Sequence, residues 1–148
     1  MKSYIYRNMI IEDYQEAYKL WLRVPGMGIS GADSYANIET YLLRNPEQSF
    51  VCINSGQLVG TILCGNDGRR AYVYHLAVAP ECHRKGVATE LVRLAISKQA
   101  QLGIQKCHLA ILTENKSGKA FWSEAGFHHR HDIDMMSKDI FGMESKVK

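Results

Sequence analysis

The residues whose types and spacing best suit chemistry form the run HRKGVA, from His83 to Ala88. Two cations, Arg84 and Lys85, stand beside the small residues Gly86 and Ala88, which let a ligand approach the backbone closely. A helix is expected to begin here, and the first N–H groups of a helix have no intrahelical partner. Those donors and the helix dipole favour an anion such as a phosphate. The run is also compatible with a plain strand-to-helix turn that has a solvated basic edge.

Two elements must position this turn, a strand before it and a helix after it. Residues 72–78 are aromatic, β-branched or apolar at most positions, as a strand covered on both faces requires, and Pro80 ends the strand. From Val87 to Gln101 the apolar residues form one helical stripe, and Gly103 supplies a stop signal. The turn therefore joins the two elements expected at the centre of the fold.

The sequence through this turn, V-x-P-x-x-H-x-x-G-x-A-x-x-L from Val78, resembles a known family motif. It is similar to the acyl-CoA pyrophosphate motif of the GNAT superfamily of N-acetyltransferases, usually written Q/R-x-x-G-x-G/A. Two positions depart from that form: His83 replaces Gln or Arg, and Arg84 stands where Gly is frequent.

A second motif supports the resemblance in the expected order along the chain. The run NKSGKAFWSEAGF, which begins at Asn115, is similar to the family's N-x-x-A-x-x-x-Y-x-x-x-G-F helix. Gly118 replaces the family's Ala, and Trp122 replaces its Tyr. Taken with the order of elements, the resemblance covers nearly the whole chain and implies one N-acetyltransferase domain over residues 1–148.

The resemblance implies an α/β (α+β) fold around a mixed, mostly antiparallel sheet of about seven strands, flanked by about four helices, with splayed central strands. The sequence patterns predict strands at 3–7, 49–54, 58–64, 72–78, 106–112, 127–130 and 133–137. They predict helices at 12–23, from Asp33 or Ser34 to Arg44, at 87–101 and at 117–125. A C-terminal tail is expected from Gly142 to Lys148.

The resemblance also implies the co-substrate, acetyl-CoA or coenzyme A, and its binding residues. The cofactor would enter between the splayed strands, pair with the backbone of Leu76, Ala77 and Val78, and meet Asn115 from the other side. Its pyrophosphate would lie on the turn formed by His83, Arg84, Lys85, Gly86, Val87, Ala88 and Thr89. Trp122 would pack on the cofactor or in the core. Lys116 and Lys119 can reach a CoA phosphate or simply be solvated.

Acetyl transfer to an amine needs a neutral amine, a donor for the developing oxyanion and a thiolate that can leave. The backbone N–H of Val78 is the expected oxyanion donor. His75 is the candidate base, because the ordinary pKa of imidazole is about 6.5; a hydrogen-bonded sheet histidine is the structural alternative. Tyr74, with Tyr72, can relay a proton through water or can serve packing alone.

Two acids, Asp33 and Glu39, can bind or deprotonate an amine, or can serve as a helix cap and a solvated helix face. The family's usual thiolate-protonating Tyr is Trp122 here, and indole donates a hydrogen bond but is not an acid near pH 7. A thiolate of ordinary thiol pKa, about 8.5, can leave without that acid. A non-catalytic acyl-CoA-binding or sensing module on the same fold is therefore the rival interpretation.

The composition and net charge suit a protein that binds an anionic ligand. The chain has 148 residues and a net charge of +3, short of the strong basic patch of a dedicated nucleic-acid binder. Its four cysteines lie far apart and are expected to be reduced thiols. No signal peptide or apolar run of membrane-spanning length is apparent, so we expect a cytoplasmic protein without membrane or nucleic-acid partners. The acceptor is expected to be an unidentified amine, and family resemblance allows a homodimer.

Two further patterns invite a ligand. Gly26, Gly28 and Gly31 form a literal G-x-G-x-x-G, but a dinucleotide fingerprint needs a strand before it, so a loop bordering the substrate site is preferred. The histidines of HHRHD, from His128 to Asp132, resemble a metal-binding tract but show no third ligand spacing. We expect a solvated hairpin there and no metal.

Overall fold

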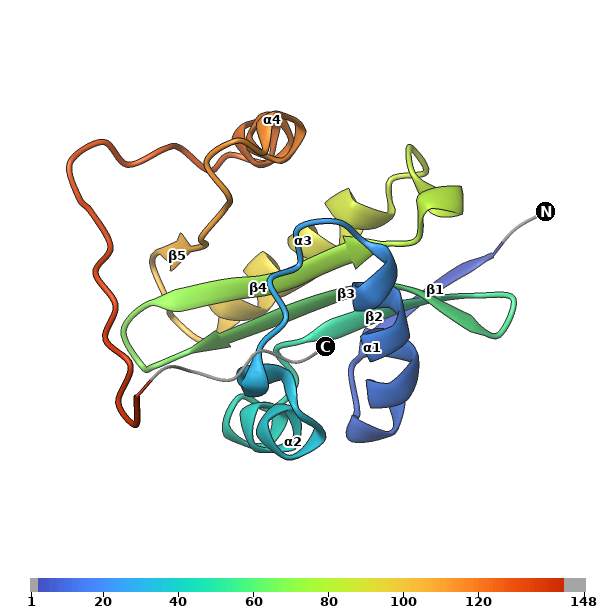
Figure 1. Ribbon diagram of the computed structural model, residues 1–148. Helices are drawn as coiled ribbons and strands as arrows, with labels where there is room; N and C mark the ends of the chain where they lie inside the picture. Colours follow the sequence, from blue (N-terminus) through green and yellow to red (C-terminus); the bar gives the residue numbers. More distant parts are fainter. Residues whose placement is uncertain (1–2, 143–148) are drawn as a thin grey trace.

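A computed structural model describes residues 3–142 as a single mixed sheet with helices on both faces (Figure 1). The strands are β1 (Tyr4–Asn8), β2 (Phe50–Asn54), β3 (Gln57–Asn66), β4 (Ala71–Val78) and β5 (Cys107–His108). They lie side by side in chain order. Successive pairs from β1 to β4 are antiparallel, whereas β4 and β5 are parallel.

In the described part of the chain, four α-helices accompany the sheet: α1 (Tyr14–Arg23), α2 (Tyr35–Arg44), α3 (Val87–Gln101) and α4 (Lys116–Glu124). Short 3₁₀ turns, η1 (Ile11–Asp13), η2 (Gly31–Asp33) and η3 (Pro80–Cys82), precede α1, α2 and α3. Helices α1 and α2 lie on one face of the sheet and α3 on the other (Figure 1).

Two adjacent residues of β3 show how the faces are packed, because successive side chains of a strand point to opposite faces. Gly60 faces α3, where an added Cβ would lie 3.0 Å from Val87 Cγ1 and 3.1 Å from Leu91 Cδ1. The missing side chain thus allows α3 to pack closely on the sheet. Thr61 faces α1, and its hydroxyl accepts a hydrogen bond of 2.9 Å from Nε1 of the buried Trp21.

The predicted central unit is confirmed, since β4, η3 and α3 follow one another around the turn. The second helix is also confirmed, with Ser34 rather than Asp33 as its cap: Ser34 Oγ accepts from Asn37 N at 3.2 Å. The first helix begins as a 3₁₀ turn and continues as α1.

The number of strands is wrong: the described residues form five strands, not seven. Residues 127–130 and 133–137 are not strands, and the predicted strand at 106–112 shortens to β5. A strand needs a neighbouring strand with which to form backbone hydrogen bonds, and a sequence pattern does not provide that neighbour. Within residues 3–142 these segments have no such neighbour. The predicted tail lies outside the described residues except for Gly142.

The splayed central strands are confirmed. Only Ala71 and Tyr72 of β4 pair with β5, opposite Cys107 and His108. β4 then continues to Val78, whereas the chain after β5 turns away toward α4 (Figure 1). From Val73 to Val78, β4 therefore has β3 on one side and no paired strand on the other among residues 3–142. We call this unpaired side of β4 the gap.

Candidate active site

The N-terminus of α3 offers uncapped backbone donors at the end of β4. Its N-cap is Gly86, in the left-handed region at φ 79°, and no side chain within residues 3–142 caps the helix. The first helical bond runs from Glu90 N to Gly86 O at 3.0 Å, so the N–H groups of Val87, Ala88 and Thr89 precede the ladder. A Cβ built on Gly86 meets no atom within 4 Å. The turn is therefore open to a ligand that can accept several hydrogen bonds.

Charge at this turn favours an anion. Residues 83–86, including Arg84 and Lys85, are exposed, and Arg84 also has a positive φ of 63°. The ring of His83 does not extend into the turn: its Nε2 lies 3.0 Å from the carbonyl oxygen of Val78. His83 thus links the turn to the end of β4, while Arg84 and Lys85 supply the positive charge.

The end of β4 presents a backbone donor toward the gap. Ala79 N donates to Val59 O at 2.8 Å, so residue 79 faces β3. Because residues of an antiparallel strand alternate between bonding the neighbour and pointing away from it, the N–H of Val78 points away from β3. Leu76 is half-buried and Ala77 is buried beside it. A ligand in the gap could pair with this stretch as an additional strand would.

His75 occupies a β-bulge in the middle of β4. The register shifts between the pairs Thr61↔Ala77 and Leu63↔Tyr74, which leaves an extra residue on β4. His75 has a φ of 47°, rare for a residue with a side chain. Its carbonyl oxygen accepts a 2.8 Å hydrogen bond from Thr61 Oγ1, the same atom that accepts from Trp21. Two buried side chains therefore hold the bulge in place.

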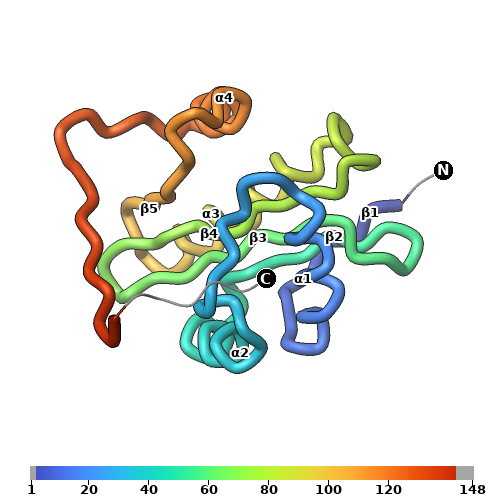
Figure 2. Tube along the Cα trace, in the orientation of Figure 1, coloured from blue at the N-terminus to red at the C-terminus, as the bar shows by residue number. Residues whose placement is uncertain are grey.

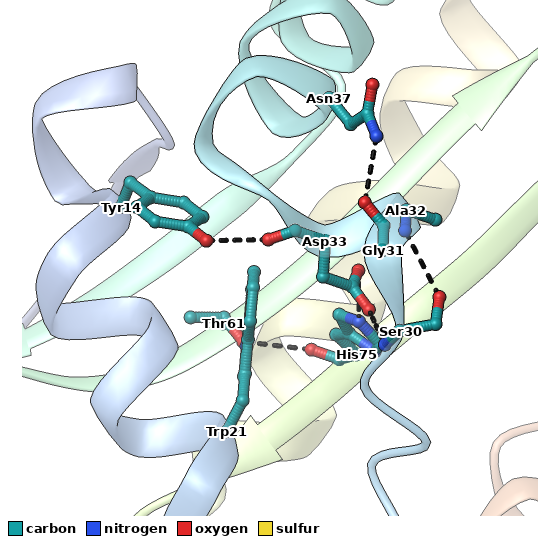
Figure 3. Close-up of polar contacts among 9 residues, drawn as sticks. All are labelled: Tyr14, Trp21, Ser30, Gly31, Ala32, Asp33, Asn37, Thr61 and His75. Carbon is teal, nitrogen blue, oxygen red and sulfur yellow. Dashed lines mark hydrogen bonds and ion pairs between the residues drawn. The ribbon is translucent and has the colours of Figure 1, made fainter. Parts of the chain in front are cut away.

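The bulge brings the His75 ring onto Asp33 (Figure 3). Nε2 of His75 lies 2.7 Å from Asp33 Oδ1, and each side chain is only 10% exposed. The other carboxylate oxygen accepts from Ser30 N at 3.0 Å, and Tyr14 donates to the Asp33 carbonyl at 2.6 Å. The ring of Trp21 lies against the imidazole, with centroids 4.7 Å apart. A carboxylate at Nε2 favours the tautomer with its proton there and leaves Nδ1 as an acceptor.

The sequence singled out both residues but did not join them. His75 and Asp33 are 42 positions apart, and their contact depends on the path of the loop between α1 and α2. The acid considered beside Asp33, Glu39, is exposed on α2. In the sequence, the two residues were noticeable only separately: Asp33 as an acid at the start of the second helix, and His75 as a polar residue in a mostly apolar strand.

Tyr74 and Tyr72 lie on the β4 face that α1 and α2 leave partly open. Their rings stack at 6.4 Å, and Tyr74 meets Tyr41 edge-on at 6.3 Å. Partial burial, with Tyr72 beside it, raises the pKa of Tyr74. Tyr74 therefore remains a protonated phenol at neutral pH and can donate a hydrogen bond.

The second motif forms α4. Asn115 is its N-cap, with Oδ1 accepting from Gly118 N at 2.9 Å. A Cβ on Gly118 would lie 2.6 Å from Asn115 Nδ2, so the glycine leaves room for this cap. Trp122 is half-buried and packs edge-on against Phe127, with ring centroids 4.9 Å apart. Lys119 donates to the carbonyl of Thr113.

The other sequence patterns that could bind a ligand are the histidine tract, the glycine-rich loop and the cysteines. His129 and His131 lie with ring centroids 4.2 Å apart, yet among residues 3–142 no three His, Cys, Asp or Glu side chains are placed to share a metal ion. The glycine-rich loop follows α1 rather than a strand. All four cysteines are free thiols. None of the helices in the described range is long and apolar enough to span a bilayer.

Comparison with known proteins places these features in context. Residues 8–127 match the model of the acetyltransferase (GNAT) family. An acetyltransferase of Photorhabdus laumondii is 30% identical over 120 residues, which cover 81% of this chain and 83% of that protein.

Solved structures share the fold. The PaiA N-acetyltransferase of Thermoplasma acidophilum, in complex with coenzyme A, superposes with a TM-score of 0.75 at 19% identity, over 97% of this chain and 96% of that one. A glucosamine-6-phosphate N-acetyltransferase of Arabidopsis thaliana gives a TM-score of 0.64 at 16% identity, over 93% and 99% of the two chains.

Proposed function

Because the chain belongs to the acetyltransferase (GNAT) family, we propose that it transfers an acetyl group directly from acetyl-CoA to a primary amine. The acceptor is a small molecule or an amine of a peptide or protein. One observation carries the proposal: His75, buried against Asp33 of η2, lies on β4, the strand whose end can present the Val78 N–H to the gap. A base and an oxyanion donor are thus held on one rigid element.

The gap and the turn suit the two ends of acetyl-CoA. The uncapped N–H groups of Val87, Ala88 and Thr89, with Arg84 and Lys85, would bind the pyrophosphate. The pantetheine arm would pair with the backbone of β4 from Leu76 to Val78. The Asn115 amide would contact the arm from the α4 side, and Trp122 would pack beside α4. A solved relative of this fold is in complex with coenzyme A, which supports the assignment.

His75 would remove the proton that an amine must lose in forming the new bond. With Nε2 bonded to Asp33, the acceptor nitrogen is Nδ1, and the carboxylate stabilises the imidazolium that forms. The amine nitrogen bonds to the thioester carbon. The thioester carbonyl oxygen, which gains negative charge, accepts a hydrogen bond from the Val78 N–H. The carbon–sulfur bond then breaks, and the sulfur leaves with its electron pair.

No acid on α4 is required for that last step. Trp122 stands at the family's Tyr position and packs on Phe127. A thiolate with a thiol pKa of about 8.5 can leave unassisted. Tyr74, kept protonated by its raised pKa, is the phenol on β4 that would donate to the leaving group through water.

The test is titration calorimetry with acetyl-CoA, followed by free-thiol release over a panel of alkylamines, α-amines, polyamines and amino sugars. Binding together with acceptor-dependent thiol release is expected and would identify the acceptor class. Binding without release from any amine would favour an acyl-CoA-binding or sensing module, which the Trp122 replacement keeps as the second candidate. Absence of binding would contradict both.

A further inference from the structure

One helix, α1, holds both members of the His75–Asp33 pair. Tyr14 and Trp21 are seven positions apart on α1 and therefore lie on the same side of the helix. The Tyr14 hydroxyl donates to the carbonyl oxygen of Asp33 at 2.6 Å, and the Trp21 ring lies against the imidazole of His75 with centroids 4.7 Å apart. Figure 3 shows both aromatic side chains extending from α1 toward the pair. The helix thus contacts the acid and the imidazole at once.

The backbone of Asp33 depends on Tyr14 for its attachment to the rest of the fold. Asp33 N donates to Ser30 O at 3.0 Å, and Ser30 N donates to Asp33 Oδ2 at 3.0 Å, but both bonds stay within the η2 turn. Within residues 3–142, the bond from Tyr14 is the one that joins the Asp33 backbone to another element. It can form because the loop after α1 runs back toward the start of that helix (Figure 2). The Asp33 carboxylate can therefore hold the imidazole only as firmly as Tyr14 holds η2.

Tyr14 is itself fixed by its surroundings. The preceding residue, Asp13, is 6% exposed, and its carboxylate accepts two hydrogen bonds of 2.8 Å from Arg7 on β1. The Tyr14 ring packs edge-on against Trp21 and Tyr35, with centroids 6.4 and 5.4 Å away. Burial raises the pKa of the Tyr14 phenol, so its hydroxyl stays a donor at neutral pH. The residue has the rigidity that an orienting group needs.

We propose that Tyr14 is a positioning residue for the base: through Asp33, its hydroxyl fixes the orientation of the His75 imidazole. The inference rests on the proposed function, in which Nδ1 of His75 accepts the proton of the amine. Alignment of reacting groups contributes strongly to rate, and displacements of about 1 Å are costly. A carboxylate free to shift with η2 would leave the imidazole several orientations. Tyr14 needs no contact with either substrate for this role.

The substitution Tyr14→Phe removes the hydroxyl and keeps the ring. We expect it to lower kcat/KM for an alkylamine by about 2- to 12-fold, the factor that corresponds to one hydrogen bond, with CoA affinity within about twofold of wild type. Tyr18→Phe is the matched control. Tyr18 is a half-buried tyrosine on the same helix, and its hydroxyl makes no hydrogen bond within residues 3–142, so this variant should keep wild-type activity.

A double-mutant cycle tests whether Tyr14 acts through His75. The effect of Tyr14→Phe should disappear in a His75→Ala background, because there is then no imidazole to orient. A loss of the same factor in both backgrounds would mean that Tyr14 acts elsewhere and would overturn the proposal. Wild-type kcat/KM in the single variant would overturn it as well.

The ring N–H of His75 gives a test that does not require catalysis. In protein labelled with ¹⁵N-histidine, a proton on Nε2 that is bonded to Asp33 and belongs to a side chain only 10% exposed should give a downfield resonance, assigned by its loss in His75→Ala. Tyr18→Phe should leave its exchange with water unchanged, and Tyr14→Phe should accelerate that exchange at least about tenfold.

Two results of this NMR experiment would refute the positioning role. One is an exchange rate in Tyr14→Phe equal to that of wild type. The other is a wild-type protein without the protected resonance, since the pair would then not be rigid. Either result counts whether or not an amine is acetylated, so failure of the proposed function and failure of this inference are told apart.

Discussion

At the level of single residues, His75 combines a strained backbone with a buried, partnered side chain. A non-glycine residue at positive φ costs about 1–3 kcal/mol and persists only where its surroundings hold it. Here Thr61 binds the carbonyl, Trp21 binds Thr61, and Asp33 binds the ring. Bonds to both ends of the residue leave the imidazole a single orientation, which a general base requires.

Removal of the base should reduce turnover without weakening cofactor binding. General base catalysis is worth about 10²–10⁴-fold, so we expect His75→Ala to lower kcat/KM for an alkylamine by about that factor. Asp33→Asn should lower it less, since it removes the charge but can keep a hydrogen bond. Both variants should bind CoA within about twofold of wild type.

The matched control is Glu39→Gln, an exposed acid on α2, which should keep full activity. The rate measured from about pH 5 to pH 9 is the decisive reading, because a general base accepts the amine proton only in its unprotonated form. If His75→Ala and wild type showed the same rates across that range, His75 would be a structural residue.

The substitution Thr61→Val should destabilise the fold, because it leaves two buried polar groups without their hydrogen-bond partner. The substitution keeps the shape but leaves the Trp21 N–H and the His75 carbonyl without the hydroxyl, in a buried site where Thr61 is 0% exposed. An unsatisfied buried polar group costs about 1–3 kcal/mol, so with two such groups we expect the free energy of unfolding to fall by about 2–6 kcal/mol. Thr40→Val on the exposed face of α2 should change it by less than about 0.5 kcal/mol. Equal effects in urea unfolding would contradict this account.

At this scale the sequence could indicate single residues but not their contacts. His75 was noticeable as a polar residue within an apolar strand. Its pairing with Asp33 depends on a bulge and on a loop that ends in η2, and neither leaves a periodic pattern. The cap of α2 illustrates the same limit: Asp33 and Ser34 are both good caps, and only the backbone path selects Ser34.

Among the elements, α3 and its turn were the most predictable, because amphipathic spacing and a glycine are local signals. The segments at 127–130 and 133–137 were the least predictable, because a strand exists only when another strand pairs with it. The same alternating pattern is satisfied by a partner from a second copy as well as by one in the same chain. Sequence alone does not distinguish the two.

The substitution Gly86→Glu should abolish the binding of CoA at the N-terminus of α3. The substitution places bulk and negative charge where the uncapped N–H groups of the helix would meet a pyrophosphate. Gly68→Glu is the matched control, since Gly68 also has a positive φ, of 89°, with no atom within 4 Å of an added Cβ. Both variants carry similar backbone strain and the same charge. Calorimetry should show lost CoA binding for the first and wild-type affinity for the second; unchanged affinity in a folded Gly86→Glu protein would remove the turn from the site.

At the scale of the whole molecule, the proposed function assigns the binding of CoA and the binding of the acceptor to different parts of β4. In the proposed function, the far end of β4 and the turn into α3 would face the anionic part of the co-substrate, whereas the bulge at His75 contacts Asp33 in the segment between α1 and α2. The acceptor would therefore approach from the helix face that carries Asp33, and CoA from the gap beside β5. Such a division lets the acceptor loops vary while the binding of CoA stays unchanged.

CoA should consequently stabilise the entire fold. A ligand that binds only the native state adds RT ln(1 + [L]/Kd), about 2.7 kcal/mol at 100 times Kd. For a domain of this size that corresponds to an increase in Tm of roughly 5–11 °C. Thermal scans at constant protein concentration should show this increase for wild type and for His75→Ala, because both retain the turn, and none for Gly86→Glu. An equal increase in all three proteins would mean that CoA binds elsewhere, whereas an increase lost only in His75→Ala would transfer the binding role from α3 to the bulge of β4.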